Sequence, residues 1–188
     1  MNWELVQEDT YYRGRILEAD ARSTSDPEQW EEYAELKTRK GSYTLGIYGH
    51  MNAASLYQTQ GETHAALSAY ERGLAAAMRA GYKELAVILT YQMAQLYERA
   101  EDWDACIAVY ERLGAFCEEK DAYFLAADAY EHAAEIMARA GKDVTGYRKP
   151  IELWERNVRH WEEQGHEDDA AWSRRHIELY RKLFGVAE

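Results

Sequence analysis

The chain has 188 residues, and 22 lysines and arginines against 34 aspartates and glutamates give it a formal net charge of −12. This acidic balance argues against a protein that binds nucleic-acid phosphates or docks on an anionic membrane, so we expect neither a nucleic-acid nor a membrane partner. The chain has only 2 prolines and is rich in alanine, leucine, glutamate and arginine, a composition that favours helix.

The compartment is predicted from the N-terminus and the two cysteines. The first residues lack a basic segment followed by an apolar run, and no stretch approaches the length of a transmembrane helix. Cys106 and Cys117 fall on one expected helix, about 16 Å apart at about 1.5 Å of rise per residue, which is too far for a disulfide. We therefore expect a cytoplasmic protein with two reduced, buried cysteines.

Helix-ending signals divide the chain about every 20 residues. They stand at Gly41, Gly61, Gly81, Glu101-Asp102, Lys120-Asp121, Gly141 and Gly165. Between them apolar residues follow helical spacing, and Asp26-Pro27 is a typical helix start. The pattern predicts nine helices, over residues 2–22, 27–39, 42–60, 62–80, 82–100, 102–119, 121–140, 150–164 and 166–184.

The helices form a repeat of about 40 residues. Residues 61–100 match residues 101–140 without a gap at ten identical positions, and the triplet that begins at Tyr70 and Tyr110 returns at Trp154 after a four-residue insertion within 141–149. One pair of helices cannot bury its apolar face alone and must stack on its neighbours. We expect a single helical-repeat domain, with units 1–40, 41–80, 81–120 and 121–164 and a closing helix over 166–184.

Small residues and aromatic residues recur at fixed spacings along the repeat. The series Ala54, Tyr57, Gly61, Ala66 and Tyr70 resembles the core of the tetratricopeptide repeat, in a long variety that is also similar to the helical array of soluble NSF attachment proteins. The resemblance implies an all-α, right-handed superhelical solenoid of antiparallel helix pairs. It also implies a concave groove, lined by the first helix of each pair, that binds an extended or helical segment of a partner.

Positions carried over from the resemblance predict which residues line this groove. They are Glu8, Tyr11, Tyr12, Arg15, Tyr48, Met51, Asn52, Ser55, Ile88, Tyr91, Gln92, Gln95, Asp128, Glu131, His132 and Glu135, with Arg174 and Arg175 from the closing helix. Tyrosines and amides suit a peptide ligand, and the carboxylates suit a basic one. The alternative for each tyrosine is that it fills space between helices.

No catalytic, cofactor or metal site is predicted. The chain lacks nucleotide-binding and hydrolase fingerprints, and the cluster His166-Glu167-Asp168-Asp169 is typical of a helix start. One helix face carries the carboxylates of Asp128, Glu131 and Glu135. Crowding of their negative charges would raise the pKa of a carboxyl group, and Arg139 could also pair with them. We expect a non-enzymatic protein-interaction scaffold. The alternatives are a structural subunit that self-assembles through ends near Trp3 and Trp172, and a small-ligand or metal site in the groove.

Overall fold

The computed structural model describes residues 26–186, and every regular element in this range is an α-helix. The helices are α2 (Pro27–Arg39), α3 (Tyr43–Thr59), α4 (Thr63–Ala80), α5 (Lys83–Arg99), α6 (Trp103–Glu119), α7 (Tyr123–Arg139), α8 (Lys149–Glu163) and α9 (Glu167–Phe184). All eight agree with the expected bounds within two residues, so the all-α, helical-pair prediction is confirmed. The expected helix over 2–22 lies outside the described residues.

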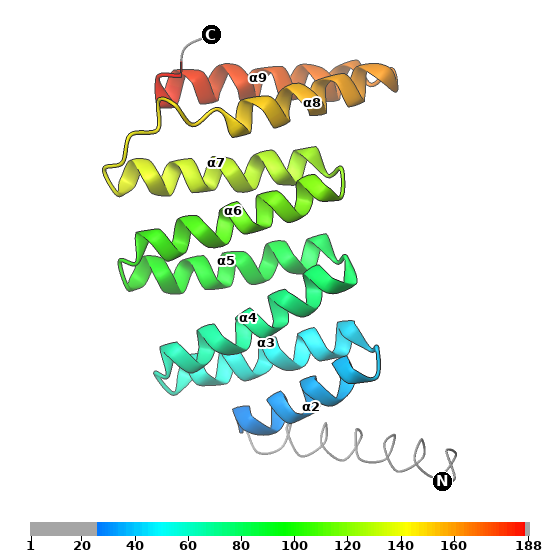
Figure 1. Cartoon of the computed structure of the whole chain (residues 1–188), viewed down its shortest axis with the longest axis vertical. Helices are drawn as coiled ribbons and strands as arrows, with labels where there is room; N and C mark the ends of the chain where they lie inside the picture. The colour runs from blue at the N-terminus through cyan, green and yellow to red at the C-terminus, as the bar shows by residue number, and fades with distance from the viewer. Residues whose placement is uncertain (1–25, 187–188) are drawn as a thin grey trace. The chain divides into compact units, whose positions relative to one another are not determined.

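The chain divides into two compact units between Leu96 and Tyr97. In the N-terminal unit α2 packs against α3 and α3 against α4, and α5 follows α4. In the C-terminal unit α6 packs against α7, α7 against α8 and α8 against α9. Within each unit successive helices lie side by side and run in alternating directions (Figure 1).

One type of tight turn ends each of the helices α2 to α8. Each turn contains one residue in the left-handed region, with φ between 52° and 80°. The next residue donates its backbone N–H to the carbonyl five positions back, as Tyr82 does to Ala77 at 2.9 Å. These left-handed residues are Gly41, Gly61, Gly81, Glu101, Asp121, Gly141 and Gly165. The predicted helix-ending signals are therefore confirmed, including the two that are not glycine.

The four-residue insertion forms a packed loop between α7 and α8. The Asp143 carboxylate accepts hydrogen bonds from the backbone N–H and the hydroxyl of Thr145, at 2.9 and 2.7 Å. Val144 is buried, and the Tyr147 hydroxyl donates to Glu111 at 2.9 Å. Pro150 occupies the first turn of α8, as the sequence predicts.

Alanines and a few large rings make up the core. Ala53 and Ala54 in α3, and Ala133 and Ala134 in α7, are fully buried. The first residue of the recurring triplet is also buried in each copy, at Tyr70, Tyr110 and Trp154. Small residues let helices approach closely, and the rings fill the spaces between them.

Both cysteines are free and buried on α6, as expected. Burial raises the pKa of the Cys106 thiol to about 11, so that thiol stays protonated and unreactive at neutral pH. Among α2 to α9, none has the length and apolar character that crossing a membrane requires.

Gly49 allows α3 to approach α2, and its replacement tests that contact. A Cβ atom at Gly49 would lie 2.8 Å from the Ala34 Cβ and 3.0 Å from the Ala34 Cα, so the helix backbones would have to move apart. Overpacking costs about 1–3 kcal/mol, while alanine gains about 1 kcal/mol in helix propensity. We expect Gly49→Ala to lower the free energy of unfolding in urea by about 1 kcal/mol. The exposed Ser55→Ala on the same helix is the control, and a gain in stability for Gly49→Ala would contradict the close contact.

Candidate functional site

In the N-terminal unit, the predicted groove positions lie on one accessible face of α3 and α5. Tyr48 and Ile88, which are 40 positions apart, expose 49% and 44% of their surface. Asn52, Ser55 and Gln95 are exposed as well. The structure therefore leaves an aromatic and amide surface open to a ligand on these two helices.

Three other predicted residues of this unit are less accessible. Met51, Tyr91 and Gln92 are partly buried, and the Gln92 side-chain oxygen accepts a 3.5 Å hydrogen bond from the hydroxyl of Tyr70 on α4. Gln92 therefore supports the packing of α5 on α4 in addition to facing outward. The four candidates before α2, which are Glu8, Tyr11, Tyr12 and Arg15, lie outside the described residues.

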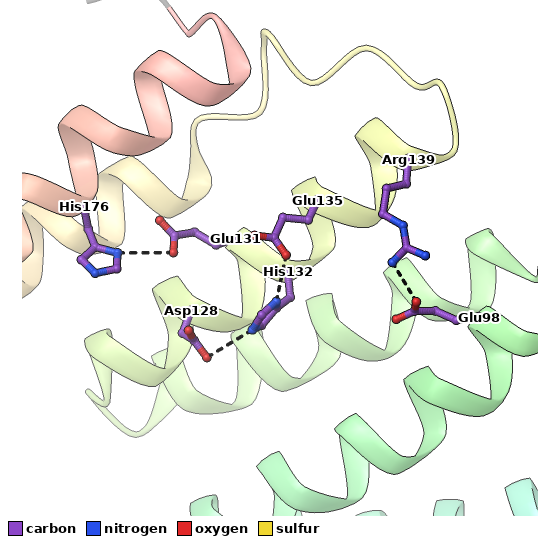
Figure 2. Close-up of polar contacts among 7 residues, drawn as sticks. All are labelled: Glu98, Asp128, Glu131, His132, Glu135, Arg139 and His176. Atoms are coloured by element: carbon purple, nitrogen blue, oxygen red, sulfur yellow. Dashed lines mark hydrogen bonds and ion pairs between the residues drawn. The ribbon is translucent and has the colours of Figure 1, made fainter.

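In the C-terminal unit, a histidine separates two of the predicted carboxylates (Figure 2). The His132 imidazole lies with Nδ1 3.2 Å from Glu135 Oε2 and with Nε2 3.8 Å from Asp128 Oδ2. The hydrogen bond to Glu135 raises the pKa of His132 against the opposing effect of burial, and His132 lowers the pKa of Glu135. A protonated His132 thus offsets part of the negative charge of this face.

Arg139 does not join the carboxylates on its own helix. Its guanidinium bonds Glu98 Oε2 at 2.7 Å and lies over the Trp103 ring, 5.3 Å from the centroid. The ion pair of Arg139 is therefore with Glu98, while its charge makes a smaller contribution to lowering the pKa of Glu135. The main compensation of Glu135 comes from its hydrogen bond with His132.

Glu131 faces α8 and α9 rather than the solvent (Figure 2). Its Oε1 accepts a 2.9 Å hydrogen bond from Trp154 Nε1, and its Oε2 lies 3.7 Å from His176 Nδ1. Burial raises the pKa of Glu131 to about 7, with a smaller contribution from the charges of Asp128 and Glu135, while the Trp154 bond lowers it. The predicted rise of a carboxyl pKa on this face is borne out at Glu131, which changes charge near neutral pH.

An aromatic cluster beside Glu131 was missed by the sequence analysis. Phe124 lies 5.4 Å from Trp172 and 5.6 Å from Trp154, and His176 lies 4.0 Å from Trp172, measured between ring centroids. Phe124 and Trp172 remain 43% and 40% exposed. Phe124 stands four positions before Asp128 and so shares its helix face, which is the signal that could have found it.

The closing helix contributes different residues from those expected. Trp172 and His176 of α9 meet the α7 face, whereas Arg174 pairs with Glu162 on α8 and Arg175 is exposed. The Arg174 side chain thus lies beside the end of α8 rather than beside Glu131. Glu131 receives an imidazole as its neighbour instead of a guanidinium.

Metal-ligating groups do not converge in the described part of the chain. Within residues 26–186, no three side chains of histidine, cysteine, aspartate or glutamate are grouped so as to hold a metal ion. His166 stands at the start of α9, with Asp169 3.8 Å away, as the helix-start interpretation predicts. The C-terminal face instead combines carboxylates, imidazoles and two exposed rings, which suit recognition of a cationic side chain.

The described helices have the antiparallel arrangement of a helical-repeat fold. The family model described as "SNAP: Soluble NSF attachment protein, SNAP" matches residues 15–164. The chain therefore belongs to the soluble NSF attachment protein family, a family of non-enzymatic, helical adaptor-like scaffolds that bind protein partners.

Two other comparisons were made. The search of curated proteins finds no match. Among solved structures, the chain matches the "Crystal structure of BtubC (BKLC) from P. vanneervenii" with 13% identity and a TM-score of 0.32, over 100% of this chain and 94% of that chain.

Glu131 predicts a measurable dependence of stability on pH. Burial raises its pKa from an ordinary value of 4.5 to about 7 in the folded protein, so the folded state holds a proton that the unfolded state releases. The contribution of Glu131 to stability is fully present below about pH 4.5 and is lost as the pH rises through about 7, for a total of at most about 3 kcal/mol. Glu131→Gln keeps an acceptor for Trp154. In this variant the free energy of unfolding should depend less on pH between pH 5 and 8 than in the wild type.

The control for this measurement is Glu119→Gln, which removes an exposed carboxylate from α6. We expect it to retain the wild-type slope in urea denaturation series at several pH values. An unchanged slope in Glu131→Gln would show that Glu131 does not carry the proton.

Proposed function

We propose that this protein is an interaction scaffold that binds a peptide or helical segment of a protein partner through the exposed faces of α3, α5 and α7. The observation that carries the proposal is the recurrence of one accessible face in the same repeat register. Positions 48, 88 and 128, and positions 55, 95 and 135, are all accessible, whereas positions 53, 93 and 133 beside them are buried.

The N-terminal face suits the backbone and apolar side chains of a peptide. Asn52 and Gln95 offer amide donors and acceptors, and Tyr48 and Ile88 offer apolar surface that is already exposed. Amides pair with peptide groups while an aromatic face covers a side chain, so this combination favours an extended or helical segment over a small polar molecule.

The C-terminal face suits a basic segment. Asp128 and Glu135 are accessible carboxylates, and Phe124 and Trp172 are exposed rings on which a lysine or arginine could rest. The formal net charge of −12 adds a long-range attraction for such a partner. The two reduced, buried cysteines support a cytoplasmic location for this interaction.

Partner capture followed by direct binding tests this function. Wild type and two variants would be used to purify partners from the native host, and the partner would then be titrated with purified proteins. We expect Tyr48→Ala with Ile88→Ala, or Asp128→Asn with Glu135→Gln, to weaken binding at least tenfold. Raising the salt concentration should weaken the wild type more than the carboxylate variant, because exposed charges are screened.

Glu119→Gln with Glu163→Gln is the matched control, since it removes two exposed carboxylates of the same unit from α6 and α8. Its affinity should stay within about twofold of wild type. A partner whose affinity is the same for wild type and both face variants, all confirmed folded by circular dichroism, would overturn the proposal.

Self-assembly is a second candidate, favoured by the apolar stripe on α9. Leu179 and Leu183 expose 50% and 64% of their surface and lie on the same helix face as Trp172. Such a stripe on the last helix of a repeat array can stack on a second copy.

Sedimentation velocity over a wide concentration range decides this second candidate. Self-assembly predicts a species larger than the monomer in the wild type and a monomer in Leu179→Lys with Leu183→Lys. The control replaces two other exposed residues by lysine, Gln60 in the turn before α4 and Ser68 on α4. It should leave the assembly unchanged. A wild type that stays monomeric at every concentration eliminates this candidate.

A further inference from the structure

A cleft of about 340 Å³ opens in the N-terminal unit between α2 and α4, above α3. His50 reaches it from the side of α3 opposite to Tyr48 and Asn52, so the cleft is separate from the interaction face. The volume is at the lower end of the range of small-molecule sites, about 300–1,000 Å³. Its lining residues are Glu35, Thr38, Arg39, His50, Arg72, Ala75, Ala76 and Arg79.

The equivalent place in the C-terminal unit is filled and neutralised. His50 corresponds to Tyr130, 80 positions later, and Arg72 corresponds to Arg156 in the recurring triplet. There the Tyr130 ring is buried, and Arg156 bonds Glu118 at 2.8 Å. The repeat can therefore close this space with an aromatic ring and an ion pair.

At three repeat positions around this place, the C-terminal unit has an acidic residue and the N-terminal unit has a neutral or basic one. The replacements in register are Thr38 for Glu118, Arg39 for Glu119 and Arg79 for Glu163. Arg72 pairs with Glu31, but Arg39 and Arg79 have no ion pair among the described residues. In a protein of net charge −12, the cleft thus gathers three guanidinium groups against the single lining carboxylate of Glu35.

Two buried polar atoms at the cleft lack a partner. His50 is 4% exposed, and neither its Nδ1 nor the buried Oγ1 of Thr38 has a hydrogen-bond partner within residues 26–186. Thr38 Oγ1 lies against Gly46 of α3, whereas His50 lines the cleft. An unpaired buried polar group is destabilising, so a bound group that pairs with His50 would be favoured. Burial, and next the charge of Arg72, lower the pKa of His50 to about 4, so its imidazole is neutral at pH 7.

We propose that this cleft binds a small phosphorylated molecule, with the phosphate held by Arg39, Arg72 and Arg79 and hydrogen-bonded by His50. Guanidinium groups match phosphate oxygens in paired hydrogen bonds. Three guanidiniums and the His50 imidazole match the larger number of oxygens on a phosphate better than the two oxygens of a carboxylate. Ala75 and Ala76 provide an apolar wall for the rest of the ligand.

Calorimetric titration of the full chain tests the site with inorganic phosphate, glycerol 3-phosphate and adenosine monophosphate, and with acetate as the carboxylate control. We expect phosphate or its esters to bind and acetate to bind at least tenfold more weakly. Equal affinities for phosphate and the esters would identify a site for the free anion. Tighter binding of an ester would identify a site for a phosphorylated metabolite.

Matched variants locate the binding. Arg39→Ala with Arg79→Ala should weaken binding at least tenfold, whereas Glu35→Gln should tighten it by removing the lining carboxylate. The control is Arg99→Ala with Arg175→Ala, which removes two exposed guanidiniums outside the cleft and should change the affinity less than twofold. Because the altered side chains are exposed, circular dichroism should confirm that every variant is folded.

The His50 imidazole supplies a second readout. In NMR spectra its resonances should shift on addition of phosphate, and its pKa should rise, because a nearby negative charge favours the protonated ring. Absence of binding to all phosphate compounds, equal affinity in wild type and the double arginine variant, or unmoved His50 resonances would each overturn the proposal.

Discussion

The architecture depends on a repeated local constraint, the left-handed residue that ends each of the helices α2 to α8. At each of these turns the next backbone N–H satisfies a carbonyl that the helix end would leave unpaired. Within each unit, a turn that leads directly into the next helix makes the two helices antiparallel, whereas the turn after α7 leads into the packed loop before α8. Glu101 and Asp121 adopt the same conformation at a small energetic cost, which shows that position rather than glycine itself is required.

Buried alanines and glycines then set how closely the helices approach. Gly49 lies against Ala34, and Gly114 lies against the ring of Tyr130. Because the backbones are close, large side chains are confined to a few positions and are buried there by several helices at once. The accessible faces of α3, α5 and α7 follow from this arrangement, since the residues that do not meet a neighbouring helix recur at the same register.

One scaffold supports different chemistry at equivalent positions. The fixed spacing of the helices makes each repeat position a similar site, and the side chain placed there decides whether the site is closed or open. Tyr130 occupies the position that His50 holds in the N-terminal unit, and Arg156 pairs with Glu118 whereas the equivalent Arg72 pairs with Glu31 on α2. Family membership accounts for the scaffold, while these local exchanges distinguish one repeat of the chain from another.

The sequence by itself determined the helices, their ends and the repeat, because caps, left-handed turns and apolar spacing are encoded within one or two helical turns. It also indicated part of the accessible face, including Tyr48, Ile88 and Glu135, but not that Tyr91 and Glu131 are partly buried. Only the tertiary structure decided that Glu131 meets Trp154, 23 positions away, and that α9 presents His176 rather than Arg174 to it. Such pairings depend on the rotation of each helix against its neighbour, which arises from the packing of many side chains distant in the chain.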